Sequence, residues 1–209
     1  MVLFFCIKIK YMNYLSKQIK EKINNILTND GVIAFVTDTV WGLGCLPSSE
    51  VAVKKIYEIK KRETQKPLIL MSNDIKNLLL YVKLNPKEKE LIEKYFPGAL
   101  TLVLEKTEKT PGYLTSGFNT VGIRVPDNKI FKEICEATEG QVLATTSANL
   151  SHEPSAKTYE QAKEYIGEKV DLIIEDFGQT AKGLESTVAL TLDNQIKILR
   201  QGEIKISND

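Results

Sequence analysis

The stretch QVLATTSANLSHEPSA, residues 141–156, combines two kinds of sequence. It begins with VLA, 142–144, a short apolar run typical of a buried β-strand. The run is followed at once by the small residues TTSAN, 145–149, which are polar except for Ala148. Such residues allow a ligand to approach the backbone closely, but they are also common in ordinary loops. The stretch therefore predicts a strand that ends in a polar loop, where open α/β sheets bind their ligands.

Segments with strand and helix periodicity alternate on both sides of it. We expect further strands at VIAFVT (32–37), PLILMS (67–72), LTLVLEK (100–106), TVGIRVPD (120–127) and VDLIIED (170–176), and a hairpin over 186–202 turned at Asp193-Asn194. Helices are expected over 14–31, stopped by Gly31, then 50–62, capped by Ser48 or Ser49, and 73–82, 85–96, 128–140 and 158–167. The helix at 85–96 has Asn85 at its cap, Pro86 next and Glu88 at the third position, and DTVWGLGCLP (38–47) is interpreted as a glycine-bearing turn.

These elements predict an α/β fold: a single domain over 1–209 with an open, twisted mixed sheet flanked by helices. Residues 1–11 are either an extra strand or a ragged end. Their apolar run VLFFCI is shorter than a secretory signal requires and has no preceding positive region. No segment approaches the ~20 apolar residues of a membrane helix. The chain is therefore predicted to be cytoplasmic, without a membrane contact.

Composition excludes some classes of function. The 209 residues carry a net charge of +1, so no global field attracts nucleic acid, although a local basic face remains open. The three cysteines have no metal-like spacing and are typical of reduced thiols. The chain has no GxxxxGK[ST] loop, Pro47 interrupts a GxGxxG pattern, and His152 is the one histidine, which excludes an HExxH metal site.

Only three of the 28 basic residues are arginines: Arg62, Arg124 and Arg200. The planar guanidinium grips carboxylates and phosphates with two hydrogen bonds, which lysine cannot do. Each arginine belongs to one of six expected strand-end clusters, which together supply hydroxyls and cations: TDTVWG (37–42), KKRETQKPL (60–68), NTVGIR (119–124), TTSAN (145–149), EST (185–187) and ILRQG (198–202). Converging cations, hydroxyls and backbone N–H groups predict a pocket for a polyanion.

Seven stretches of the chain resemble, in order, the serial motifs of the YrdC family, the threonylcarbamoyl-AMP synthases. They are AFVTDTVWGLGC, KKRETQKPLIL, FPGALTLVL, TVGIRVPD, TTSANLSHEPSA, ESTVAL and ILRQG. The resemblance runs from about residue 32 to 202 and matches the short form of the family, with a single domain. It implies a YrdC-like fold with a large concave, basic cavity. It also implies a nucleotidyltransferase reaction: L-threonine, bicarbonate or CO2 and ATP give L-threonylcarbamoyladenylate and pyrophosphate. A partner transferase would then use the adenylate to form N6-threonylcarbamoyladenosine in tRNA, with a tRNA contact by this chain as a further expectation.

The resemblance also assigns residues. Lys60 and Arg62 are implied as catalytic phosphate-binding groups. ATP binding is implied for Lys60, Arg62, Lys66, Thr120, Ser147, Asn149, Ser155 and Arg200, and threonine binding for Thr39, Arg124, Thr145 and Ser186. No protein metal site is implied, and Mg²⁺ is expected to arrive with the ATP phosphates. The chain departs from the family pattern at Ala99, His152, Ala189 and Gln201, none of which replaces a charged site residue.

Two alternatives remain. One is a non-catalytic RNA-binding module that uses the same basic concave face, although an aromatic stacking platform is missing from the sequence. The other is the carbamoyl-transferring relative fused into hydrogenase-maturation proteins, whose acylphosphatase and zinc-finger-like segments are missing here. Adenylate formation without RNA would distinguish the synthase from both.

Overall fold

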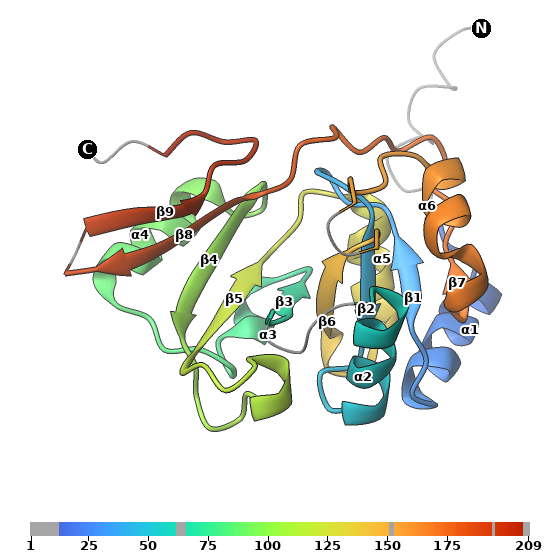
Figure 1. Ribbon diagram of the computed structural model, residues 1–209, viewed down its shortest axis with the longest axis horizontal. Helices are drawn as coiled ribbons and strands as arrows, with labels where there is room; N and C mark the ends of the chain where they lie inside the picture. Colours follow the sequence, from blue (N-terminus) through green and yellow to red (C-terminus); the bar gives the residue numbers. More distant parts are fainter. Residues whose placement is uncertain (1–12, 62–65, 151–152, 194, 207–209) are drawn as a thin grey trace, which may run out of the picture.

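The computed structural model describes residues 13–61, 66–150, 153–193 and 195–206, and its described strands all join one nine-stranded sheet (Figure 1). The strand order is β7-β1-β2-β6-β3-β5-β4-β8-β9. The strands are β1 (Ile33–Phe35), β2 (Gly42–Cys45), β3 (Ile69–Ser72), β4 (Leu100–Glu105), β5 (Thr120–Arg124), β6 (Val142–Ser147), β7 (Leu172–Ile173), β8 (Thr187–Leu192) and β9 (Gln195–Arg200). Parallel pairs (β1–β7, β3–β5, β4–β8) stand among antiparallel ones, which confirms the mixed, open sheet.

The helices are α1 (Lys17–Thr28), α2 (Glu50–Ile59), α3 (Ile75–Leu78), α4 (Pro86–Tyr95), α5 (Lys129–Ala137) and α6 (Tyr159–Ile166), with 3-10 turns η2 (Gly112–Leu114), η3 (Glu139–Gln141) and η4 (Gly167–Lys169). In Figure 1, α4 and α5 lie behind the sheet and α2 stands in front of β2. In the part of the chain that the structure describes, no helix combines the length and apolar character needed to span a bilayer.

Local capping signals explain where helices begin. The Ser49 hydroxyl accepts the Ala52 N–H, so Ser49 rather than Ser48 caps α2. The predicted capping box of α4 is confirmed, because Asn85 and Glu88 each accept the other's backbone N–H. The predicted helix over 73–82 forms only the short α3, and the predicted strand over 170–176 forms only β7.

The end of α1 differs from the prediction. The helix is capped by Asn29, and the residue in the left-handed region is Asp30, with a φ of 57°, not Gly31. Gly31 follows it and donates its N–H to the Ile26 carbonyl over 2.9 Å. A Cβ on Gly31 would lie 2.5 Å from that oxygen, so glycine is needed here for close approach rather than for its φ.

The interpretation of 38–47 as one turn was wrong in its second half, because Gly42–Cys45 forms β2 between β1 and β6. A Cβ on Gly42 would lie 2.9 Å from the Phe35 ring, and one on Gly44 would lie 2.8 Å from it. The two glycines therefore make room for an aromatic ring across a strand pair. Glycine in a strand often marks such a close approach, which the turn interpretation overlooked.

The two faces of the sheet have different roles, because successive side chains of a strand point to opposite faces. One face supplies core residues such as Leu70, Val121, Ile123 and Ala144, which are almost completely buried. Residues that alternate with them, including Ile69, Gly122 and Arg124, line a cavity on the other face. The fold thus carries polar groups from distant segments to one surface of the sheet.

Candidate functional site

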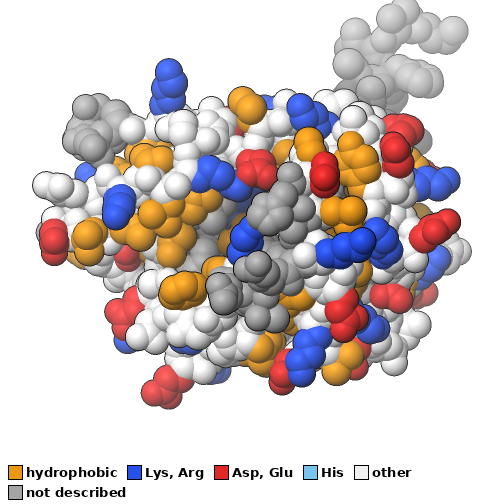
Figure 2. Space-filling view, in the orientation of Figure 1, with side chains coloured by type: hydrophobic (Ala, Val, Ile, Leu, Met, Phe, Trp, Pro, Cys, Tyr) orange, Lys and Arg blue, Asp and Glu red, His pale blue; other side chains and the backbone are white. Residues whose placement is uncertain are grey.

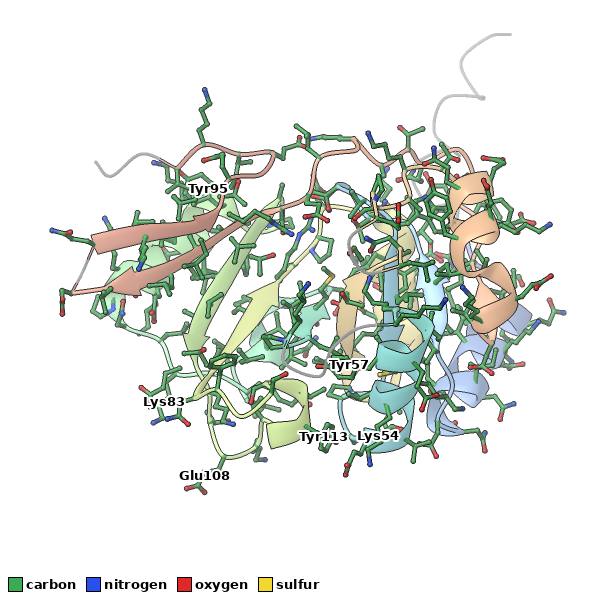
Figure 3. The ribbon with its side chains drawn as sticks, viewed as in Figure 1. Lys54, Tyr57, Lys83, Tyr95, Glu108 and Tyr113 are labelled. Carbon is green, nitrogen blue, oxygen red and sulfur yellow. The ribbon has the colours of Figure 1, made fainter. Side chains whose placement is uncertain are left out.

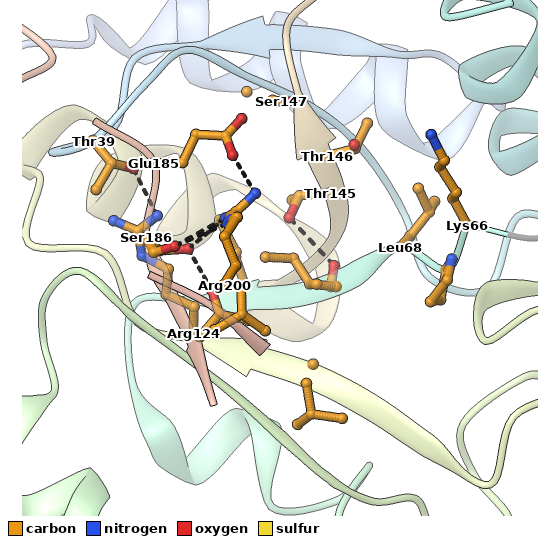
Figure 4. Close-up of a pocket in the computed structure, with 18 of the residues that line it drawn as sticks. Thr39, Lys66, Leu68, Arg124, Thr145, Thr146, Ser147, Glu185, Ser186 and Arg200 are labelled. Atoms are coloured by element: carbon orange, nitrogen blue, oxygen red, sulfur yellow. Dashed lines mark hydrogen bonds and ion pairs between the residues drawn. The ribbon is translucent and has the colours of Figure 1, made fainter. Parts of the chain in front are cut away.

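A cavity of about 550 Å³ lies over β3, β5 and β6, and the loop after β1, the start of β8 and the end of β9 complete its wall (Figure 4). This volume falls in the range of small-molecule sites, ~300–1,000 Å³. A second cavity of about 380 Å³ adjoins it, and Val40, Glu185 and Arg200 line both. On the face seen in Figure 2, hydrophobic side chains gather over β8 and β9, and cationic ones lie toward the middle.

The sequence-predicted site residues converge on these cavities. The larger cavity is lined by Thr39, Lys60, Lys66, Thr120, Arg124, Thr145, Ser147, Asn149, Ser186 and Arg200. Ser155 lies in the adjoining cavity instead. Arg62 and His152 lie outside the described residues. Segments as far apart in the sequence as Thr39 and Arg200, which are separated by 161 positions, therefore contribute to one cavity.

Arg124, at the end of β5, is 2% exposed and is held by three acceptors. Its Nε donates to the Gly98 carbonyl over 2.9 Å, its Nη1 to the Thr39 hydroxyl over 2.8 Å, and its Nη2 to the Asp38 carboxylate over 2.5 Å. Burial lowers the pKa of Arg124, and the charge of Asp38 opposes that shift. A guanidinium has five N–H donors, so two remain for a ligand beyond these contacts with described residues.

Lys60 follows α2 and is 3% exposed, so its environment is set by the protein. Its ammonium donates to the Ser147 carbonyl over 2.5 Å, to the Asn149 carbonyl over 2.8 Å and to Asn149 Oδ1 over 2.7 Å. An ammonium has three N–H donors, and these contacts engage all three. In this conformation, Lys60 fixes the polar loop after β6.

The polar loop after β6 is also bonded within itself. Ser147 Oγ donates to Asn149 Oδ1 over 2.7 Å, and Asn149 Nδ2 donates to the Glu153 carbonyl over 2.5 Å. Thr145, still in β6, donates to the Ile69 carbonyl over 3.2 Å. These bonds satisfy buried polar groups that would otherwise be costly. The small hydroxyls and amides that follow the apolar run therefore form a fixed polar wall of the cavity.

Lys66 stands at the opposite rim, before β3, and its side chain is exposed. Its carbonyl accepts the hydroxyl of Tyr57, on α2, over 3.0 Å (Figure 3). This bond ties the rim of the cavity to α2. Phe118, which also lines the cavity, is 55% exposed and forms an apolar rim instead of a core contact.

Arg200, at the end of β9, lies between Glu185 and Ser186 (Figure 4). It forms an ion pair with the Glu185 carboxylate, and its Nη2 donates to the Ser186 carbonyl over 3.0 Å. Ser186 Oγ and Thr101 Oγ1 share a hydrogen bond of 2.7 Å. Glu185 Oε1 also accepts the hydroxyl of Ser155 over 2.8 Å, so this carboxylate joins groups from both cavities.

Sequence reasoning missed Asp38, Thr101 and Glu185 as members of the site. Asp38 and Glu185 stand inside the quoted motifs TDTVWG and EST, so an acid within a motif rich in hydroxyls was the available signal. Nothing in the sequence marked Thr101, which reaches the cavity through the alternation of β4.

The predicted electropositive character of the cavity stays a prediction. Lys60, Lys66, Arg124 and Arg200 line it, but both arginines have carboxylate partners, Asp38 and Glu185. Among the described residues, no three His, Cys, Asp or Glu side chains are grouped to hold a metal ion.

The comparisons with known proteins agree with one another. A family model for Sua5, YciO and YrdC, described as "Telomere recombination", matches residues 25–202. A curated relative from Methanocaldococcus jannaschii, named "Putative threonylcarbamoyl-AMP synthase", is 33% identical over 190 residues, which are 91% of this chain and 88% of the relative.

Two solved structures have the same fold. Sua5 of Pyrococcus abyssi, complexed with L-threonine, superposes with a TM-score of 0.83 at 33% identity, over 91% of this chain and 56% of that chain. YciO of Escherichia coli superposes with a TM-score of 0.80 at 27% identity, over 90% of both chains. The chain thus spans nearly the whole of some relatives and about half of the Pyrococcus protein.

Proposed function

The chain belongs to the Sua5/YciO/YrdC family, and on that premise we propose that it is a threonylcarbamoyl-AMP synthase. It forms L-threonylcarbamoyladenylate and pyrophosphate from L-threonine, bicarbonate or CO2, and ATP. The observation that carries this proposal is the convergence of cationic and hydroxyl side chains from six separate motifs on one cavity. The Methanocaldococcus jannaschii relative, which is named for this reaction, matches over most of both chains, and this match supports the same reaction for the present chain.

In this proposal, the Arg124 end of the cavity binds threonine. The two N–H donors of Arg124 that have no described partner hold the carboxylate, since a guanidinium matches carboxylate geometry. Thr39 and Ser186 are polar contacts for the amino acid, and Thr145 contacts it through its backbone. The complex of the Pyrococcus relative with L-threonine supports an amino acid site in this fold.

The remaining polar wall binds ATP. Lys66, Thr120, Ser147, Asn149 and Arg200 line the same cavity, and Ser155 and Arg62 complete the proposed set. Lys60 contributes charge and holds the loop of Ser147 and Asn149. A direct contact of its ammonium with a phosphate requires it to exchange one of its three acceptors.

The chemistry needs little side-chain acid–base catalysis. The threonine amine attacks CO2 and loses a proton to give a carbamate. A carbamate oxygen then attacks the α-phosphorus of ATP, and pyrophosphate leaves. Positioning of the two substrates, neutralisation of developing charge by cations and exclusion of water supply the rate enhancement. Mg²⁺ enters with ATP as part of that substrate.

The adenylate then passes to a transferase that modifies tRNA, so a transferase partner and a tRNA contact belong to the proposal. A cytoplasmic location follows from that substrate. The described strands share one sheet, which supports a single catalytic domain over residues 1–209.

The test is pyrophosphate release by the purified chain with Mg·ATP and bicarbonate, with threonine present or omitted, and without tRNA. We expect release that depends on threonine and bicarbonate, together with the mass of threonylcarbamoyladenylate. Bound ATP without turnover would indicate an enzyme that requires a partner. The absence of ATP binding would contradict the proposal and favour the RNA-binding module.

A further inference from the structure

Glu185 is the one carboxylate among the described residues that line the larger cavity, and it also lines the adjoining one. Its carboxylate forms an ion pair with Arg200 and accepts the hydroxyl of Ser155 over 2.8 Å. Both partners are residues that the proposed function assigns to ATP. A negative side chain therefore occupies two groups that are expected to bind a negative ligand.

The backbone holds Glu185 at this position. Its carbonyl accepts the Glu203 N–H over 2.9 Å, and a Cβ on Gly202 would lie only 2.2 Å from that same oxygen. The C-terminal segment thus packs closely against the backbone of Glu185. The side chains at the pair are more accessible, with 46% of Arg200 and 34% of Glu185 exposed. The side-chain pair can open while the backbone stays in place.

We propose that Glu185 is an internal competitor of the polyphosphate: it holds Arg200 and Ser155 in the ligand-free protein and gives them up when phosphate oxygens arrive. This exchange of partners takes place at the boundary of the two cavities, because Glu185, Arg200 and Val40 line both of them. This inference rests on the proposed function, because it takes Arg200 and Ser155 as phosphate-binding groups.

The exchange makes the site selective for ligands with several negative charges. A partly exposed ion pair is a weak competitor, because solvent screens it. A polyphosphate carries several charges and offers many acceptor oxygens to Arg200, so it displaces the single carboxylate. An anion with little charge interacts less favourably with the Arg200 guanidinium and is still repelled by the Glu185 carboxylate. Glu185 is thus a specificity-determining residue that acts through Arg200.

The experiment compares Glu185→Gln with the wild-type chain by calorimetric titration of inorganic tripolyphosphate in EDTA. Gln keeps the shape of the side chain and an acceptor for Ser155 but removes the charge. We expect tripolyphosphate to bind roughly 3- to 30-fold more tightly to Glu185→Gln, from the lost ion pair and the lost repulsion. Unchanged or weaker binding would overturn the inference.

Glu153→Gln is the matched control, because Glu153 lines the adjoining cavity and loses the same charge. Its affinity for tripolyphosphate is expected to stay within about twofold of wild type, since a separated surface charge is screened. An equal gain in both variants would show a general field effect and overturn the inference. The gain must also vanish when Glu185→Gln is made in an Arg200→Gln background, because the competition acts through Arg200.

Circular dichroism checks that each variant is folded. If Glu185→Gln does not fold, Glu185→Asp replaces it, since a shorter carboxylate cannot hold Arg200 and Ser155 together. A smaller gain in affinity is then expected, and no gain would overturn the inference. Failure of the proposed function is distinguishable, because a folded wild-type chain would then bind neither ATP nor tripolyphosphate.

Discussion

Replacement of Arg124 by lysine tests the threonine end of the proposed site. Lysine keeps the positive charge next to Asp38 but has a single nitrogen. It cannot reach the Gly98 carbonyl, the Thr39 hydroxyl and the Asp38 carboxylate in the directions that Nε, Nη1 and Nη2 take. Two of these contacts are therefore lost, and the buried groups left unpaired cost the protein about 2–4 kcal/mol of unfolding free energy.

The effect on catalysis is larger for threonine than for ATP. Loss of a charge-assisted hydrogen bond to the threonine carboxylate is worth ~1.5–3 kcal/mol, which is a decrease of roughly 10- to 150-fold in kcat/KM for threonine. The kcat/KM for ATP, measured at saturating threonine, is expected to change by less than about threefold, because the lost interaction is with threonine and not with ATP. Thermal denaturation establishes that the variant is folded at the assay temperature.

The assay is threonine-dependent pyrophosphate release, titrated with each substrate in turn. Arg200→Lys is the matched control, since Arg200 is proposed on the nucleotide side and its side chain is 46% exposed. We expect Arg200→Lys to affect ATP more than threonine. A selective ATP defect in Arg124→Lys, or equal losses for both substrates, would refute the assignment of Arg124 to the carboxylate.

Three further predictions concern specificity, stability and packing. Serine is expected to be used with a kcat/KM roughly 5- to 150-fold below that of threonine, because a methyl-sized pocket discriminates by ~1–3 kcal/mol, and equal efficiency would contradict a shaped pocket. Burial raises the pKa of the Glu133 carboxyl. The N–H groups of Tyr14 and Leu15 and the ammonium of Lys20 lower that pKa by more than burial raises it, so the folded pKa lies below its usual value. Its stabilising contribution is thus present above the unfolded pKa of ~4.3 and is lost as pH falls through the folded pKa. Urea denaturation between pH 3 and 7 should show a smaller acid loss of stability in Glu133→Gln, and identical pH profiles would refute this. Gly44→Ala is expected to lower the unfolding free energy by about 1–3 kcal/mol, because its Cβ would lie 2.8 Å from the buried Phe35 ring, and an unchanged urea midpoint would contradict that.

The fold class was predictable from local patterns. Helix caps at Ser49 and Asn85 and the apolar strand runs act within a few residues, so a linear pattern contains them. The errors arose where distant packing decides. β2 is a strand because β1 and β6 pair with it and because its glycines admit Phe35. A glycine-rich stretch by itself is equally typical of a turn.

Many members of the candidate site were also predictable, because motif order and the scarcity of arginine pointed to Arg124 and Arg200. The hydrogen-bond and ion-pair partners of the site residues were not predictable. Arg124 meets Asp38 across 86 positions, and Lys60 meets Ser147 and Asn149 across 87 and 89. Such contacts depend on strand order and on which face of the sheet a side chain reaches.

The sequence by itself therefore determined the chemical types of the groups and the elements that carry them, since capping, alternation and guanidinium chemistry are local properties. Only the tertiary structure decided which charges are paired. It buries Arg124 beside Asp38, surrounds the Lys60 ammonium with three oxygens and places Glu185 between Arg200 and Ser155. The physical reason is that electrostatic interactions depend on distance and burial, which are set when the chain assembles the nine-stranded sheet of the described residues.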